Sequence, residues 1–275
     1  MAKKRTFERL VILADLHCGH RTGLTPPAWQ LRPSEDAEPK RMKWVNIQQE
    51  HWAWFAREIS RLKPIDHCIV NGDCIDGTGS RSGGTELITT DRNTQIDMCL
   101  KCLRHVGARD YVIIRGTPYH TGEIEDLEDI IAGQLQCKIG DHDSIGVNGT
   151  TFDCKHWIGG SYVPHGRITA IEREKLWGAI WTDRGERPWA DWVIRSHVHY
   201  CCGSFHLAGH NGRKRLQWGM TTPALQAMGT RYGARRCSGT VDFGFVRFDV
   251  RKDEPCLPYI HYLDPETTKA MVTQL

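Results

Sequence analysis

The sequence predicts one α/β domain built around two facing β-sheets. Strand-like and helix-like segments alternate in the first half of the chain, and the second half is rich in strand-like segments. The composition suits a folded globular protein, because 40% of the 275 residues are hydrophobic and 25% are charged. Since no internal repeat and no linker divides the chain, we expect residues 1–275 to form a single domain.

The first elements alternate between strand and helix. The short apolar run Leu10–Ala14 is typical of a buried strand. A polar, proline-rich stretch over residues 21–43 is expected to form a loop or lid. Apolar side chains at helical spacing then predict a helix over Trp44–Leu62. The next predicted strand, His67–Val70, runs into an Asn-Gly-Asp sequence.

A glycine-rich loop over residues 77–84 leads to the next strand–helix units. We expect a helix over Thr94–Val106 and a strand over Tyr111–Arg115. A further helix is expected after His120, with Thr121 as its cap. Acidic residues at positions 123, 125, 126 and 128 would lie in its first turns, where the helix dipole favours negative charge.

The second half contains a hairpin signal and several strands. Asn148-Gly149 predicts a tight turn, and Thr151–Lys155 would be the second hairpin strand. A helix is expected over Arg167–Trp181 and a strand over Trp192–Arg195. Two further segments are expected to close the sheets, Leu216–Met220 and Val241–Val250.

Charge and hydropathy exclude several classes of protein. A net charge of +3 and a pI near 8.3 are too mild to argue for nucleic-acid binding by themselves. No apolar run resembles a signal peptide or a membrane span, so we expect a soluble, cytoplasmic protein without membrane contact. The eleven cysteines are therefore expected to be mostly reduced and buried. The Cys99-x-x-Cys102 pair lacks a second pair at zinc-site spacing.

Six side chains that can bind metal ions lie where predicted strands end. Side chains at positions i and i+2 of a strand point the same way, so two such pairs could each aim at one point. A mixture of carboxylate oxygen and imidazole nitrogen suits Mn²⁺, Fe or Zn²⁺ better than Ca²⁺ or Mg²⁺. The number of ligands is right for two divalent ions, the arrangement that cleaves phosphate esters. The six residues are Asp15, His17, Asp73, His156, His197 and His199.

In these residues the sequence resembles the calcineurin-like metallophosphoesterases. The motif blocks of that family run D-x-H, G-D-x-x-D, G-N-H-[DE], a lone His and G-H-x-H. The third block is altered here, because Thr117 stands at the Asn position and His120 follows three residues later. The style of this block is similar to that of compact bacteriophage-type members. The matching segments, in the expected order, are Asp15–His17, Gly72–Asp76, Gly116–His120, His156 and Ser196–His199.

The resemblance implies a four-layer α/β/β/α sandwich of two mixed sheets flanked by helices. It also implies two divalent metal ions, with Mn²⁺ favoured and Fe, Zn²⁺ or Ni²⁺ as alternatives. One ion would take Asp15, His17, Asp73 and His199. The other would take Asp73, His156, His197 and the residue at the Asn position, Thr117.

The remaining site residues follow from the same comparison and from their loops. His120 would be catalytic, by protonating the leaving oxygen or by stabilising charge in the transition state. Asp76 would support Asp73 or a ligand histidine, and Glu123 could orient His120. His20 and Arg21 lie on a predicted loop near the site and are candidates for contact with the substrate.

The function implied by the resemblance is hydrolysis of a phosphate ester through a two-metal-activated hydroxide. We favour a phosphodiester, in a nucleotide or nucleic acid, because the sequence has no evident regulatory or protein-docking module. The basic segments at residues 32–43, 213–215 and 231–236 could also guide a polyanion. The alternatives are a phosphomonoesterase or protein phosphatase of the same fold, a catalytically silent metal-binding scaffold, and a zinc-stabilised nucleic-acid-binding protein.

Overall fold

The computed structural model describes residues 5–33, 39–122, 126–210, 212–228, 239–252 and 254–266. The helices are α1 (Pro39–Leu62), α2 (Arg92–Val106), α3 (Pro118–Thr121), α4 (Glu128–Leu135) and α5 (Arg167–Asp183). The strands are β1 (Glu8–Leu13), β2 (His67–Asn71), β3 (Asp110–Ile114), β4 (Lys138–Gly140), β5 (His142–Val147), β6 (Thr150–Lys155), β7 (Trp192–Arg195), β8 (Cys202–His210), β9 (Arg213–Thr221), β10 (Phe243–Val250) and β11 (Pro258–Leu263).

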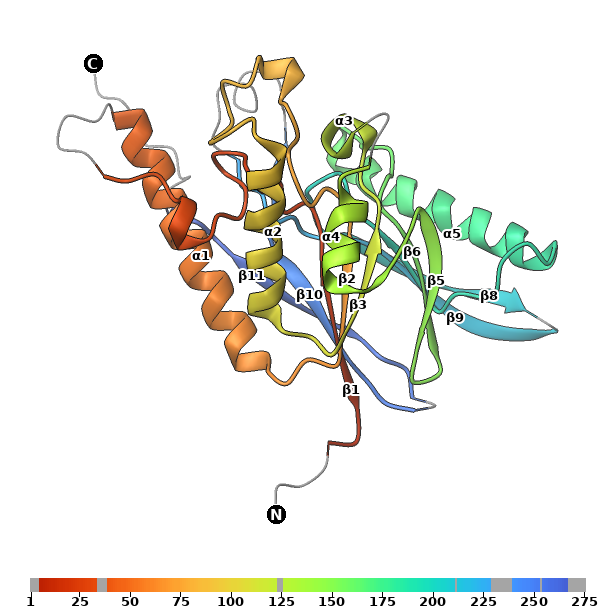
Figure 1. The fold of residues 1–275 in the computed structure, drawn as a ribbon. Helices are drawn as coiled ribbons and strands as arrows, with labels where there is room; N and C mark the ends of the chain where they lie inside the picture. The colour runs from red at the N-terminus through yellow and green to blue at the C-terminus, as the bar shows by residue number, and fades with distance from the viewer. Residues whose placement is uncertain are drawn as a thin grey trace.

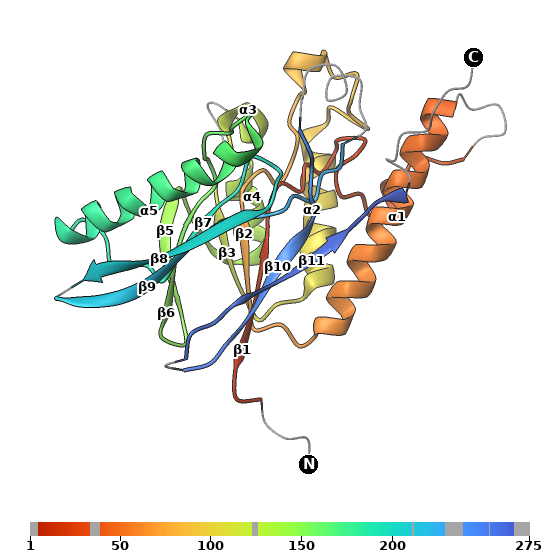
Figure 2. The ribbon, with the colours of Figure 1, turned by 180° about the vertical axis from the view of Figure 1, so that it is seen from behind.

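These elements form two mixed sheets between helices, as Figures 1 and 2 show from opposite sides. The first sheet has the strand order β11-β10-β1-β2-β3-β4, with β1, β2 and β3 parallel and β10 antiparallel to β1. The second has the order β5-β6-β7-β9-β8, with β6, β7 and β9 parallel. Helices α1, α2 and α4 cover the first sheet, and α5 covers the second. The predicted four-layer α/β sandwich is confirmed.

The alternation of side chains along β1 explains how one strand serves two layers. Leu10 and Ile12 pack between the sheets, in the same apolar cluster as Phe152 of β6. Val11 and Leu13 pack in a second cluster, together with side chains of α1 and α2. Successive residues of a strand point to opposite faces, so a strand buried on both sides is apolar throughout. This burial fixes the end of β1, where the first metal-ligand candidates begin.

A buried charge network ties α5 to the second sheet. The guanidinium of Arg195, on β7, is completely buried and donates to two carboxylates. Its Nη2 lies 2.8 Å from Asp153 Oδ2, and its Nε lies 2.9 Å from Glu174 Oε2. A buried charge requires such partners, because leaving one of them unpaired costs several kcal/mol. The network holds the end of β7 in place, just before His197 and His199 in the chain.

The helix predicted after His120 starts in the wrong place. His120 and Thr121 belong to the short helix α3, and α4 begins only at Glu128. Thr121 is therefore not a cap, and its hydroxyl donates to the carbonyl of Thr117 at 3.2 Å. Glu123 and the acidic residue at 125 lie outside the described residues, so the suggested contact between Glu123 and His120 is not described.

Other differences concern the second half and the proline-rich segment. Helix α1 begins at Pro39, so residues 39–43 of the expected loop are helical. Strands β4, β8 and β11 were not predicted. The basic segment at 231–236 lies outside the described residues. The ten described cysteines are free thiols and most are buried, as predicted. Among the helices that the structure describes, none combines the length and apolarity needed to cross a membrane.

Candidate metal centre

Four strands deliver the six metal-ligand candidates to one place. Asp15 and His17 follow β1, and Asp73 follows β2 in the same sheet. In the second sheet, His156 follows β6, while His197 and His199 follow β7. Each strand pair is parallel, so the carboxyl ends of its two strands lie at the same edge of the sheet. The structure thus brings all six residues together, in groups drawn from both sheets.

The metal-ligand candidates do not have the extended backbone that the sequence pattern predicts. Five of the six candidates have positive φ angles: 52° at Asp15, 43° at His17, 52° at Asp73, 72° at His197 and 56° at His199. The prediction that i and i+2 residues converge along an extended strand is therefore wrong, because these residues lie beyond the strand ends in left-handed backbone. Each such residue costs about 1 kcal/mol or more, and strain of this kind is concentrated at functional sites.

Backbone hydrogen bonds hold this strained segment. The amide of Asp15 donates to the carbonyl of Gly72 at 2.9 Å, and the amide of His17 donates to that of Asp73 at 3.0 Å. The amide of Cys18 donates to the carbonyl of Cys74 at 3.1 Å. The segments after β1 and β2 therefore remain paired past the end of the regular sheet, and their side chains are fixed relative to each other.

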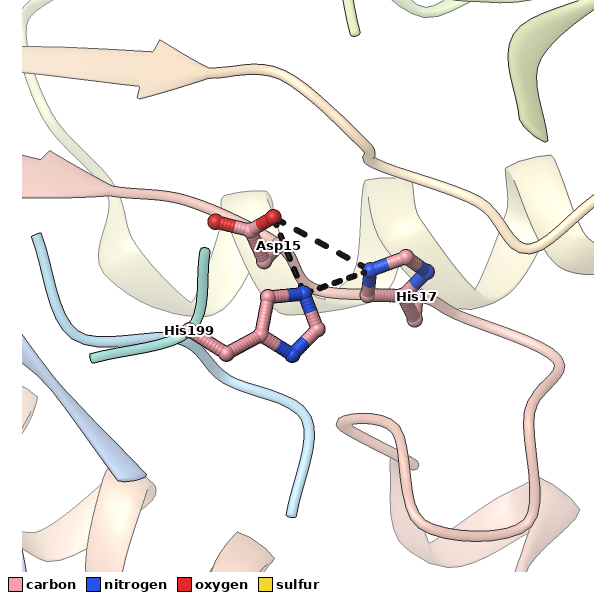
Figure 3. Close-up of side chains that lie close together, drawn as sticks. All are labelled: Asp15, His17 and His199. Atoms are coloured by element: carbon pink, nitrogen blue, oxygen red, sulfur yellow. Dashed lines mark hydrogen bonds and ion pairs between the residues drawn. The ribbon is translucent and has the colours of Figure 1, made fainter. Parts of the chain in front are cut away.

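The first group consists of Asp15, His17 and His199, whose side chains point toward one another (Figure 3). Asp15 Oδ1 lies 3.2 Å from His199 Nε2 and 4.0 Å from His17 Nε2. The two Nε2 atoms lie 3.3 Å apart. One oxygen and two nitrogens thus converge on a space of the size that a divalent ion needs.

The second group consists of Asp73, His156 and His197. Asp73 Oδ2 lies 3.1 Å from His156 Nε2 and 3.9 Å from His17 Nε2 in the first group. Asp15 Oδ1 lies 4.0 Å from His156 Nε2, so the first group also reaches the second. The two carboxylates therefore lie between the two sets of histidines, as a pair of neighbouring ions requires.

Two orphaned polar atoms show that these residues fit metal ions. Asp15 Oδ1 and His156 Nε2 are buried, and among the described residues their close contacts to His199 Nε2 (3.2 Å) and Asp73 Oδ2 (3.1 Å) lack hydrogen-bond geometry. His156 Nδ1 donates to the carbonyl of Asn71 at 2.7 Å, which turns Nε2 toward the centre. A ligand histidine is usually oriented in this way by its other ring nitrogen. Buried polar atoms without partners are costly, and a cation between them would satisfy both.

The charges of the centre favour binding of cations. Burial opposes ionisation of Asp15 and Asp73, but the neighbouring histidines outweigh it and hold both carboxyl pKa values below their ordinary range. Burial, reinforced by His156, lowers the pKa of His197 to about 4, so its ring is neutral and able to coordinate. The carboxylates raise the pKa of His156 and of His199 against the effect of burial. A metal ion would therefore compete with a proton for these two rings.

Asp76 orients two histidines. Its Oδ1 accepts a hydrogen bond from His17 Nδ1 at 2.8 Å and lies 3.4 Å from His120 Nδ1. The backbone carbonyl of Asp76 lies 3.1 Å from the same nitrogen of His120. The rings of His17 and His120 meet edge to face, with centroids 4.6 Å apart. His120 therefore lies beside the first group, although three residues separate it from Thr117.

Thr117 lies against Asp73. Its hydroxyl is 3.0 Å and 3.2 Å from the two carboxylate oxygens, and its amide donates to Oδ1 at 2.7 Å. In the structure Thr117 thus fixes the carboxylate that lies between the two groups. Direct coordination of a metal ion by Thr117 stays a prediction.

Glu128 joins two segments of the site instead of interacting with a helix dipole. Glu128 was expected to interact with a helix dipole, but it is completely buried and accepts from two backbone amides. Its oxygens lie 2.8 Å from the amide of Cys74 and 2.7 Å from that of Gly116. Burial raises its pKa to about 7, against the effect of these two amides. Glu128 therefore connects the second motif block to the third. Its position in the first turn of a helix does not reveal this role in the sequence, because acidic residues are common there.

His20 and Arg21 have other partners. His20 Nδ1 accepts from the amide and the hydroxyl of Thr22 at 3.2 Å and 3.0 Å. The Nε of Arg21 donates to the carbonyl of Leu87 at 3.2 Å, and its guanidinium lies 4.3 Å from the centre of the Trp44 ring. Neither residue belongs to the three groups of possible metal ligands. Their contact with a substrate stays a prediction.

Comparison with known proteins identifies the fold. No protein-family model and no curated protein sequence matches the chain. The purple acid phosphatase of yellow lupin aligns with 98% of the chain at 11% identity and a TM-score of 0.50, and the chain spans 53% of that protein. An archaeal phosphodiesterase aligns with 92% of the chain and 99% of its own length, at 13% identity and a TM-score of 0.42. The NAD nucleotidase of Haemophilus influenzae aligns with 93% of the chain and 50% of its own length, at 9% identity and a TM-score of 0.42.

At such identities a likeness establishes the fold alone. The chain therefore has the fold of the calcineurin-like metallophosphoesterases, the superfamily that its ordered motif blocks resemble.

Proposed function

We propose that this protein is a hydrolase that cleaves a phosphate ester with the help of two divalent metal ions. The observation that carries the proposal is the pair of facing ligand groups, with Asp15 Oδ1 and His156 Nε2 buried between them and unsatisfied. Neighbouring cations supply activation of a water molecule and neutralisation of the phosphoryl oxygens.

The ligands divide between two ions. Asp15, His17 and His199 would hold one, and His156 and His197 would hold the other. Asp73 lies near both sets and would be shared, with Thr117 fixing its carboxylate or completing the second set. Mn²⁺ is the favoured metal, and Fe, Zn²⁺ and Ni²⁺ are the alternatives, because the set combines carboxylate oxygens with imidazole nitrogens.

His120 is the proposed catalytic residue of the chain itself. Asp76 holds its Nδ1, so the ring is fixed beside the first group and its Nε2 is left for the substrate. From this position His120 would donate a proton to the leaving oxygen or stabilise negative charge on the phosphoryl group. Asp76 would act through His17 and His120, as a positioning residue.

We favour a phosphodiester over a monoester as the substrate. His165 lies on the loop that follows His156, and Arg167 and Arg173 follow it on α5, where they could bind more of an extended anion than one phosphate group. The test is hydrolysis of bis-p-nitrophenyl phosphate and of p-nitrophenyl phosphate by Mn²⁺-loaded protein, with Asp73→Asn as the control. We expect faster hydrolysis of the diester, and loss of this activity in the variant.

The other outcomes distinguish the alternatives. Faster hydrolysis of the monoester would indicate a phosphomonoesterase or protein phosphatase of the same fold. Bound metal without hydrolysis of either compound would contradict the proposal and favour a silent scaffold.

A further inference from the structure

The loop between β6 and α5 carries an exposed tryptophan beside the metal centre. Trp157 directly follows His156, and 53% of its surface is exposed. Its ring centroid lies 6.4 Å from that of His197, with the two planes inclined by 35°. Most tryptophans are buried or half-buried, so an exposed one beside a polar centre is a candidate for contact with a ligand. It offers a flat surface on which another ring can stack.

A basic cavity continues from this tryptophan. It has a volume of about 470 Å³, and its lining includes Gly159, Gly160, His165 and Arg173. A Cβ at position 159 would lie 3.5 Å from Arg173 Nη2 and 4.0 Å from Trp157, so Gly159 separates the tryptophan from the arginine. The described lining contains no acidic side chain. The cavity is therefore suited to an anion.

The cavity also adjoins the metal centre. A Cβ at Gly160 would lie 3.6 Å from the side chain of Val198, which stands between two ligand candidates, His197 and His199. Arg173 projects from α5 and has no hydrogen bond or ion pair to any described residue. We call the surface formed by Trp157, Gly159, Gly160 and Arg173 the binding wall; it begins beside His156 and His197 of the candidate metal centre.

We propose that this wall binds a single-stranded nucleic acid, with a base stacked on Trp157 and a neighbouring, uncleaved phosphate bound by Arg173 in the cavity. Proteins that bind single strands combine aromatic platforms with basic grooves in this way. The inference rests on the proposed phosphoesterase function, because it takes the scissile phosphate to lie at the metal centre. A small phosphomonoester would use neither feature.

The experiment compares two fluorescein-labelled strands of six units. One is an oligothymidine, and the other is an abasic strand with the same backbone, both with phosphorothioate linkages to slow hydrolysis. Binding to Mn²⁺-loaded protein is measured by fluorescence anisotropy at several salt concentrations. Hydrolysis of bis-p-nitrophenyl phosphate is measured in parallel and tests the proposed function by itself.

The wild type is expected to bind the strand with bases about tenfold more tightly than the abasic strand. Trp157→Ala should remove this preference. Tyr262→Ala should keep it, because Tyr262 is also an exposed aromatic residue (70%) but lies on β11 of the other sheet. Arg173→Gln should weaken binding of both strands alike and reduce the slope of log affinity against log salt by about 0.7. Arg61→Gln, on the exposed side of α1, should change neither quantity.

Two results would overturn the inference. If the wild type binds the two strands with equal affinity, or binds neither, no base stacks on Trp157. Unchanged affinity and salt slope in Arg173→Gln remove the phosphate role of the cavity. If the wild type hydrolyses the small diester in either case, the proposed function stands without this substrate. If it binds the strands as expected but hydrolyses nothing, the binding wall stands and the proposed function fails.

Discussion

Replacing Gly72 by alanine should disturb the metal centre without removing a ligand. Gly72 has a φ angle of +87°, which costs a residue with a Cβ about 1–2 kcal/mol. The added Cβ would also collide with the imidazole of His156 and would lie 2.8 Å from the Cα of Gly116. The ring must then move away from the carbonyl of Asn71, and the lost hydrogen bond costs about 1 kcal/mol more.

These contributions predict a loss of about 2–3 kcal/mol in the free energy of unfolding of the metal-free protein, measured by urea denaturation. The same variant should lose the ion held by His156, measured as Mn²⁺ content, and with it the diesterase activity. Gly133→Ala is the matched control, because a Cβ there meets no atom within 4 Å and lies within α4. It should gain about 0.5–1 kcal/mol and keep both ions. A Gly72→Ala variant with wild-type stability and full metal content would refute the reasoning.

Three further predictions follow from the contacts of single side chains. Asp76→Asn should lower activity or Mn²⁺ affinity about 10- to 100-fold, since it weakens the acceptor of two histidines; unchanged kinetics and binding would contradict its positioning role. The pKa of Glu128 is raised to about 7, so the stability that it contributes is present below its ordinary pKa and is lost as the pH rises through 7. The unfolding free energy of the metal-free wild type, relative to Glu128→Gln, should therefore fall by about 2.5 kcal/mol between about pH 5 and pH 8, and a constant difference would contradict this. Arg195→Met should cost about 3–5 kcal/mol in urea denaturation, because it leaves Asp153 and Glu174 without their buried partner, and a cost below about 1 kcal/mol would show that the network is not needed.

The elements that local patterns determine were predicted well. The strand at Trp192–Arg195 has its predicted bounds, and α2 begins only two residues before the predicted helix, at Arg92. Apolar periodicity is strong in these segments and agrees with their burial. The convergence of the six metal-ligand candidates was also predictable, because their types and order along the chain were sufficient.

The features that depend on distant contacts could not be predicted from local patterns. The left-handed backbone at Asp15 and His17 depends on amide hydrogen bonds to the segment after β2. The role of Glu128 depends on two amides, 54 and 12 residues away in the chain. Strand β11 has exposed side chains on both faces and is defined mainly by its pairing with β10. Long-range pairing of this kind leaves little trace in the local sequence.

The number of metal ions bound per chain tests the central claim most directly. Equilibrium dialysis against Mn²⁺ should give two ions for the wild type. His199→Ala and His156→Ala, one from each ligand group, should each retain about one. A wild type that binds no ion or a single ion, or two variants that both keep the full complement, would contradict a two-metal centre built from these residues.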